Sequence, residues 1–152
     1  MCRIDGKFLG ELDAAITPWI VDLYRQYHRL VQGRHYWSMS WVPTSLRDNM
    51  REDVNDDIQL MSMGKRLLAG ATQCVPQDVA LARTSDDSLF ATLAYLVSDP
   101  ALSMLSIWSP PFGLGMPRAL AHWREELAAA LTPGFLGSRL LGPPLFHIDP
   151  AH

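Results

Sequence analysis

A long stretch in the second half of the chain is almost free of charge. From Ser88 to Pro117 the only charged residue is Asp99, and a solvated segment of that length would carry more charged side chains. We therefore expect this stretch to be buried, either in the chain's own core or against a partner. With 48% apolar and 19% charged residues, the 152-residue chain has enough apolar surface for one domain with a sizeable core.

Helical periodicity flanks and enters this stretch. Apolar residues at three- and four-residue spacing predict an amphipathic helix over residues 8–31, with Gly33 just past its end. Pro18 is expected to kink this helix or divide it. A second helix is predicted from a cap at residues 85–87 to about Ser98. A third follows Pro110, and its expected core side consists of Leu114, Ala119, Leu120, Trp123, Leu127 and Leu131.

Two segments are typical of strands. The aromatic segment 35–42 predicts one strand, and the segment 101–108 predicts a second, buried one. Between them we expect a polar loop over residues 44–57, a short helix over 58–68 and a helical turn over 77–83. Strands that alternate with a larger number of helices predict an α/β layered fold, although two strands make a small sheet.

Composition and spacing exclude several classes of function. A net charge of −3 excludes a strongly basic nucleic-acid binder, and we expect no nucleic-acid partner. The two cysteines, Cys2 and Cys74, exclude a disulfide scaffold. Gly64-Lys65 lacks the other residues of a phosphate-binding P-loop, and the histidines lack zinc-ligand spacing. No apolar run reaches the length of a membrane span and no signal peptide is visible, so we expect a cytoplasmic protein without a membrane partner.

Two segments resemble a known family. The first is Gly33-Arg34-His35-Tyr36-Trp37-Ser38-Met39-Ser40, and the second is 101–131, ALSMLSIWSPPFGLGMPRALAHWREELAAAL. Together they resemble the auxin-responsive Gretchen-Hagen-three family of acyl-acid amido synthetases, and its bacterial relatives most. Its members carry a G-R/K-x-Y-W-S-x-S strand, a D-x-x-L-x-x-I-S-V-W-S-P-x-F strand and turn, and an H-W-x-x-L helix. The second pattern is matched by Asp99, Leu102, Leu105, Ser106, Ile107, Trp108, Ser109, Pro110 and Phe112, and the helix by His122 and Trp123.

The resemblance implies an α/β fold, namely a helix-rich part of the large N-terminal domain of an adenylate-forming, luciferase-like enzyme. Such enzymes use ATP and Mg²⁺ to convert a carboxylic acid to an acyl-adenylate, which the amine of an amino acid then attacks. The implied partners are therefore a small carboxylic acid and an amino acid.

The chain departs from the family in one respect. It contains neither the Ser/Thr/Gly-rich phosphate loop nor the Y-x-[SA]-[ST]-E and Y-R-x-G-D segments that hold ATP in the family. We therefore expect residues 1–152 to be a partial N-terminal domain without the phosphate loop and the C-terminal domain, inactive alone and unable to bind ATP tightly. Apolar surface exposed by such a truncation is expected to favour self-association.

The resemblance also implies an acid-binding site. The helix over residues 88–97 helps to wall the acid pocket in the family, and apolar side chains suit an aryl or alkyl acid. The candidate substrate-binding residues are Phe90, Leu93, Ala94, Trp108 and Ser109. For the helix residues ordinary core packing is the competing interpretation, and for Ser109 it is a helix cap.

Two other interpretations of the whole chain remain open. One is a truncated, non-catalytic module that binds small acids or another protein. The other is an unrelated small helical protein whose likeness to the family is accidental. A fold in which segments 35–42 and 101–108 are not strands of one sheet would favour the last interpretation.

Overall fold

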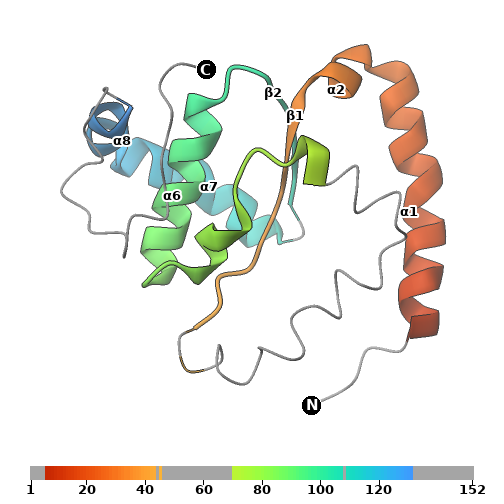
Figure 1. The fold of residues 1–152 in the computed structure, drawn as a ribbon, viewed down its shortest axis with the longest axis horizontal. Helices are drawn as coiled ribbons and strands as arrows, with labels where there is room; N and C mark the ends of the chain where they lie inside the picture. The colour runs from red at the N-terminus through yellow and green to blue at the C-terminus, as the bar shows by residue number, and fades with distance from the viewer. Residues whose placement is uncertain (1–5, 44, 46–69, 108, 132–152) are drawn as a thin grey trace.

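The computed structural model describes residues 6–43, 45, 70–107 and 109–131, and Figure 1 shows their arrangement. These residues form a mixed α/β structure with a small parallel sheet. The elements in chain order are α1 (Gly6–Gln26), α2 (His28–Gln32), β1 (Arg34–Trp37), the 3-10 helix η1 (Gln77–Leu81), α6 (Ser85–Ser98), β2 (Leu102–Ser106), α7 (Pro110–His122) and α8 (Arg124–Ala130). The loop predicted over 44–57 lies outside the described residues except for Ser45, and the helix predicted over 58–68 lies outside them entirely.

The two predicted strands pair in one sheet. β1 and β2 are parallel, with Tyr36 opposite Leu105 and Trp37 opposite Ser106. The register shifts between Arg34 and His35. Parallel strands need a long crossover connection, and α6 lies in this crossover (Figure 1). Both strands are shorter than predicted, because the last residues paired in register are Trp37 on β1 and Ser106 on β2.

The first helix is interrupted at a different residue from the one predicted. α1 continues through Pro18 and ends at Gln26, while Tyr27 (φ −120°, ψ 86°) separates it from α2. Proline leaves the carbonyl four residues earlier without its helical donor. That carbonyl belongs to Ala14, and both Ala14 and Pro18 are exposed, so water can satisfy it. Of the two predicted effects of Pro18, a kink or a division of the helix, the division is wrong.

The third predicted helix is also divided, and part of its predicted core side is exposed. α7 ends at His122 and α8 begins at Arg124, with Trp123 between them. Trp123 and Leu127 are buried as predicted, but Leu114 is 70% exposed and Leu120 is 38% exposed. Because the helix is interrupted at Trp123, residues 110–122 and 124–131 do not share a single helical periodicity, and their apolar residues do not form one continuous side.

α6 is the central helix of the core. Its N-cap is Thr84, whose hydroxyl oxygen accepts a hydrogen bond from the Asp87 N–H (3.1 Å) and donates one to the Asp87 carboxylate (2.8 Å). The predicted helix over 85–98 is therefore confirmed, with the cap one residue earlier. The core around it consists of Tyr36, Cys74, Val75, Val79, Phe90, Ala91, Leu93, Ala94, Leu96, Met116, Trp123, Leu127 and Ala130.

β2 is less buried than the sequence predicts. None of its five residues is fully buried, and Leu105 is 50% exposed. Among the described residues β2 pairs only with β1, so it lies at an edge of the sheet. The nearly uncharged stretch from Ser88 to Pro117 is therefore divided: its α6 part forms core, whereas its β2 and α7 parts expose apolar side chains.

Candidate functional site

The two parallel strands end at the same edge of the sheet. Trp37, the last residue of β1, lies opposite Ser106, the last residue of β2. Just beyond, the Ser38 N–H donates to the Ser106 carbonyl (2.9 Å). Ligands of open α/β sheets bind outside the carboxyl ends of the strands. We therefore take this edge, with Trp37, Ser38, Ser106 and the start of α7, as the candidate site.

A glutamine side chain holds β1 from the side opposite β2. The Gln73 Oε1 accepts from the Trp37 N–H (2.9 Å), and its Nε2 donates to the Trp37 carbonyl (3.1 Å). Next to it, the Cys74 N–H donates to the His35 carbonyl (2.9 Å). The amide of Gln73 thus replaces a peptide group of a neighbouring strand, and β1 is bonded on both edges where it reaches the candidate site.

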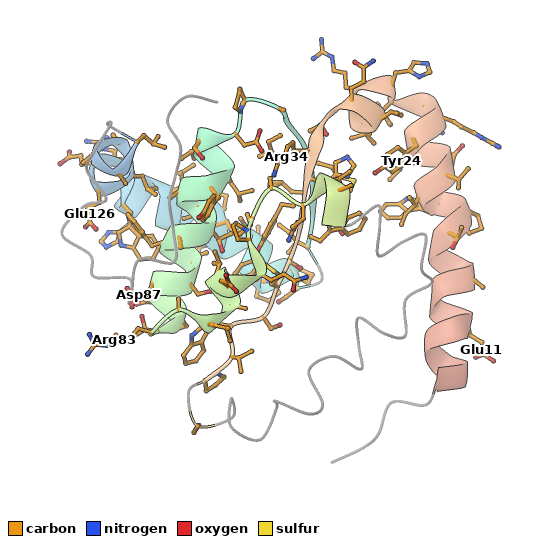
Figure 2. The ribbon with its side chains drawn as sticks, in the orientation of Figure 1. Glu11, Tyr24, Arg34, Arg83, Asp87 and Glu126 are labelled. Carbon is orange, nitrogen blue, oxygen red and sulfur yellow. The ribbon has the colours of Figure 1, made fainter. Side chains whose placement is uncertain are left out.

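His35 joins the first two helices to the sheet. Its side chain is fully buried, and the Leu30 carbonyl lies 2.8 Å from its Nε2. Because a carbonyl only accepts, this contact assigns a proton to Nε2, and in the neutral ring Nδ1 then accepts from the Tyr24 hydroxyl (3.0 Å). Figure 2 shows Tyr24 on the side of α1 that faces β1. Burial raises the pKa of Tyr24 further above neutral pH, where its hydroxyl is protonated and can donate.

The indole of Trp37 carries a buried polar atom, Nε1, which has no hydrogen-bond partner among the residues that the structure describes. Its ring lies edge-on to His35, with centroids 6.3 Å apart. A buried N–H without an acceptor costs about 1–3 kcal/mol. The indole N–H and the hydroxyls of Ser38, Ser106 and Ser109 are neutral groups, which can orient a ligand but provide no strong base.

Charge lies at the other end of the strands. The Arg34 Nε is 3.3 Å from an Asp99 carboxylate oxygen, and its guanidinium also donates to the Gln73 carbonyl (2.9 Å). The other oxygen of Asp99 accepts from the Ala101 N–H (2.9 Å). This cluster lies where both strands begin, so it fixes their start rather than the candidate site. In the described part of the chain no group of three or more His, Cys, Asp or Glu side chains is placed to hold a metal ion.

The structure divides the predicted substrate-binding residues. Phe90, Leu93 and Ala94 lie together on α6 and are buried in the core, with relative exposures of 3%, 3% and 1%. Ser109 is exposed and is the N-cap residue of α7, but its side chain makes no capping hydrogen bond. Trp108 lies outside the described residues. In this conformation protein atoms cover the α6 residues, and only Ser109 lies at the strand ends with its surface open.

Gln73 and the bonding role of His35 were not predicted from the sequence. Gln73 is far from Trp37 in the chain, and no local pattern marks a side chain that substitutes for a strand. His35 stands next to Tyr36 in the aromatic segment, which is typical of a strand core, but its partners come from α1 and α2. The aromatic segment after a helix end is the one signal that could have indicated a buried histidine at this position.

Cys74 provides a test of this packing. Burial, and then the nearby Asp99 carboxylate, raise the pKa of the Cys74 thiol to about 11. Because this pKa is above the ordinary value of 9.0, the protonated thiol favours folding below pH 9, and that contribution to stability is lost as pH rises from about 9 to about 11.

In a Cys2→Ser variant we expect thiol reagents at pH 8 to label Cys74 only as fast as the protein unfolds. Labelling at the rate of a free cysteine would contradict this burial.

Comparison of the chain with protein-family models, with curated proteins and with solved structures gave no match. No helix among the described residues combines the length and the apolar character needed to cross a bilayer.

Proposed function

We propose that this chain is part of the N-terminal domain of an ATP-dependent acyl-acid amido synthetase and does not catalyse adenylation alone. In this proposal β1, β2 and α6 form the part of the domain that walls the acid, while ATP and Mg²⁺ are held by motifs that this sequence lacks. The acid is a small aryl or alkyl carboxylic acid, and the acceptor is an amino acid.

The parallel pairing of the two family-like segments carries the proposal. An accidental likeness would be favoured if segments 35–42 and 101–108 were not strands of one sheet. They instead pair in parallel, with Tyr36 opposite Leu105. The Ser38 N–H bonded to Ser106 (2.9 Å) extends the contact to the serine of the Y-W-S pattern. This pairing favours the interpretation that the two segments belong to one fold as neighbouring strands. The proposed assignment to the family rests on the sequence resemblance.

The position of α6 gives further support. Its buried side chains pack under the sheet, and Phe90 contacts Trp123 edge-to-face with ring centroids 5.7 Å apart. Trp123 belongs to the H-W pattern of the resemblance, so α6 connects the two family-like segments through the core. An acid at the strand ends would reach Leu93 and Ala94 after a rearrangement of the side chains that cover them.

A chimeric enzyme tests the proposal. Residues 8–131 would replace the matching segment of a working acyl-acid amido synthetase, and acid-dependent ATP–pyrophosphate exchange would be measured. We expect exchange in the chimera and none with the 152-residue chain alone, because the chain lacks groups that stabilise charge on the transferring adenylate. The control is the same chimera with the additional change Gly10→Ala. Its exchange activity is expected to equal that of the unchanged chimera, since a Cβ at Gly10 meets no atom within 4 Å.

The outcomes separate the competing functions. A chimera that folds but shows no exchange contradicts the synthetase proposal. Exchange by the purified chain alone contradicts the expectation that adenylation needs the ATP motifs that this sequence lacks. The non-catalytic acid-binding interpretation predicts instead that an aryl acid raises the melting temperature of the chain alone, in proportion to the logarithm of its concentration.

A further inference from the structure

The last residue of β1 is held on one edge by a side chain. Neighbouring residues of a strand direct their backbone groups to opposite edges, and the Ser38 N–H donates to the Ser106 carbonyl at the end of β2. The N–H and C=O of Trp37 therefore point away from β2. Both bond to the Gln73 amide, at 2.9 Å and 3.1 Å, so one side chain fixes the end of β1 on this edge.

The chemistry of this contact suits a glutamine. A primary amide presents one acceptor and one donor group side by side. Only the orientation with Oε1 toward the Trp37 N–H and Nε2 toward the Trp37 carbonyl satisfies both backbone groups. A carboxylate has no donor for the carbonyl, and an apolar side chain of the same length bonds neither group. The contact therefore depends on the amide itself and not only on the volume of the side chain.

Two backbone contacts hold Gln73 against β1. The Arg34 guanidinium donates to the Gln73 carbonyl (2.9 Å), and it is itself paired with Asp99 (3.3 Å). The N–H of the next residue, Cys74, donates to the His35 carbonyl (2.9 Å). The start of β1 thus holds the backbone of Gln73, and the side chain of Gln73 holds the end of β1.

We propose that Gln73 is a positioning residue for the carboxylic acid: by fixing the end of β1, it sets where Trp37 and Ser38 stand beside the bound acid. The inference rests on the proposed function, which places the acid at the carboxyl ends of the strands. Gln73 acts through Trp37 and does not touch the acid. A site whose supporting contacts are lost holds its ligand less well. ATP is held by motifs that this sequence lacks, so its binding does not depend on Gln73.

Substitutions of Gln73 in the chimeric enzyme test this role. Gln73→Met keeps the length of the side chain but removes both hydrogen bonds. It is expected to raise the KM for the acid in ATP–pyrophosphate exchange about tenfold, the factor for one lost hydrogen bond, and to leave the KM for ATP unchanged. Gln73→Glu is expected to show the same defect at about pH 7.5. That defect should shrink toward about pH 5, because the protonated carboxyl again has one acceptor and one donor. The controls are Gln77→Met and Gln77→Glu, at an exposed glutamine on η1, and both KM values are expected to stay unchanged in them.

The outcomes distinguish this inference from the proposed function. No exchange in the unchanged chimera contradicts the proposed function, and this inference with it. Exchange in the unchanged chimera, with an unaltered acid KM in Gln73→Met, overturns the positioning role alone. The same holds if Gln73→Met raises the KM values for acid and ATP alike, because that marks a general loss of structure. If Gln73→Met does not fold, Gln73→Glu decides. Its defect is measured relative to the unchanged chimera at each pH, and a defect that does not shrink as the pH falls refutes the role.

Discussion

Replacement of Gly33 by alanine is expected to lower the free energy of unfolding by about 2–3 kcal/mol, as overpacking of a closed contact does. A Cβ at this position would overlap the Ser103 side chain and would lie 2.9 Å from the Ala101 carbonyl oxygen. The backbone of Gly33 is extended (φ −93°, ψ 171°), so the cost comes from the contact with the start of β2 and not from φ. Urea denaturation measures the change, and the melting temperature is expected to fall by roughly 4–12 °C.

Two further variants separate this contact from a general effect of removing a glycine. Gly10→Ala, in α1 with open space around it, is expected to be neutral or stabilising by up to about 1 kcal/mol. Ser103→Gly loses its own hydrogen bond to the Arg34 carbonyl (3.1 Å), but it removes the atoms that a Cβ at Gly33 would meet. The double variant is therefore expected to be more stable than the sum of the two single changes predicts. Additive effects would show that Gly33 does not approach Ser103.

Replacement of Trp123 by alanine is expected to have the largest effect, about 3–5 kcal/mol. Its side chain is 8% exposed, lies between α7 and α8, and packs edge-to-face against Phe90 of α6. Truncation removes this large apolar surface and leaves a cavity at the point where three helices meet. Denaturation in urea measures the loss, and a change below 1 kcal/mol would contradict the burial of Trp123.

A matched control and a double-mutant cycle test the same contact. Leu114→Ala removes an apolar side chain from α7 that is 70% exposed, so its effect is expected to stay within about 0.5 kcal/mol. A cycle of Phe90→Leu and Trp123→Leu is expected to give a coupling energy of about 0.5–1.5 kcal/mol for the aromatic pair. The absence of coupling would mean that the two rings do not touch in solution.

Local sequence patterns predicted those elements whose causes lie within a few residues. The cap at Thr84 bonds to Asp87, so helix α6 was predicted to within one residue. The helical turn predicted over 77–83 is confirmed as η1, and the two aromatic or apolar segments were correctly assigned as strands. Each of these depends on short-range hydrogen bonds or on the intrinsic preference of the residues.

The candidate site depended more on tertiary structure. The sequence resemblance indicated that α6 and the strand ends belong together, but it did not show that Phe90, Leu93 and Ala94 are covered while Ser109 is exposed. Burial depends on which surfaces pack over a side chain, and those surfaces come from distant parts of the chain. Segment 101–108 does contain a strand, but the prediction that this strand is buried was wrong for the same reason.

By itself, the sequence determined the α/β class, the central helix, the two strands and the exclusion of a strongly basic or disulfide-based protein. Tertiary structure alone decided that the first helix breaks at Tyr27 rather than at Pro18, that Gln73 completes the bonding of β1, and that β2 pairs only with β1 among the described residues. The physical reason is the separation along the chain between the groups that interact. The backbone groups of caps and turns bond to residues that are neighbours in the sequence. A strand's second partner, a glycine's close contact and a histidine's tautomer are set by groups that only the folded chain brings together.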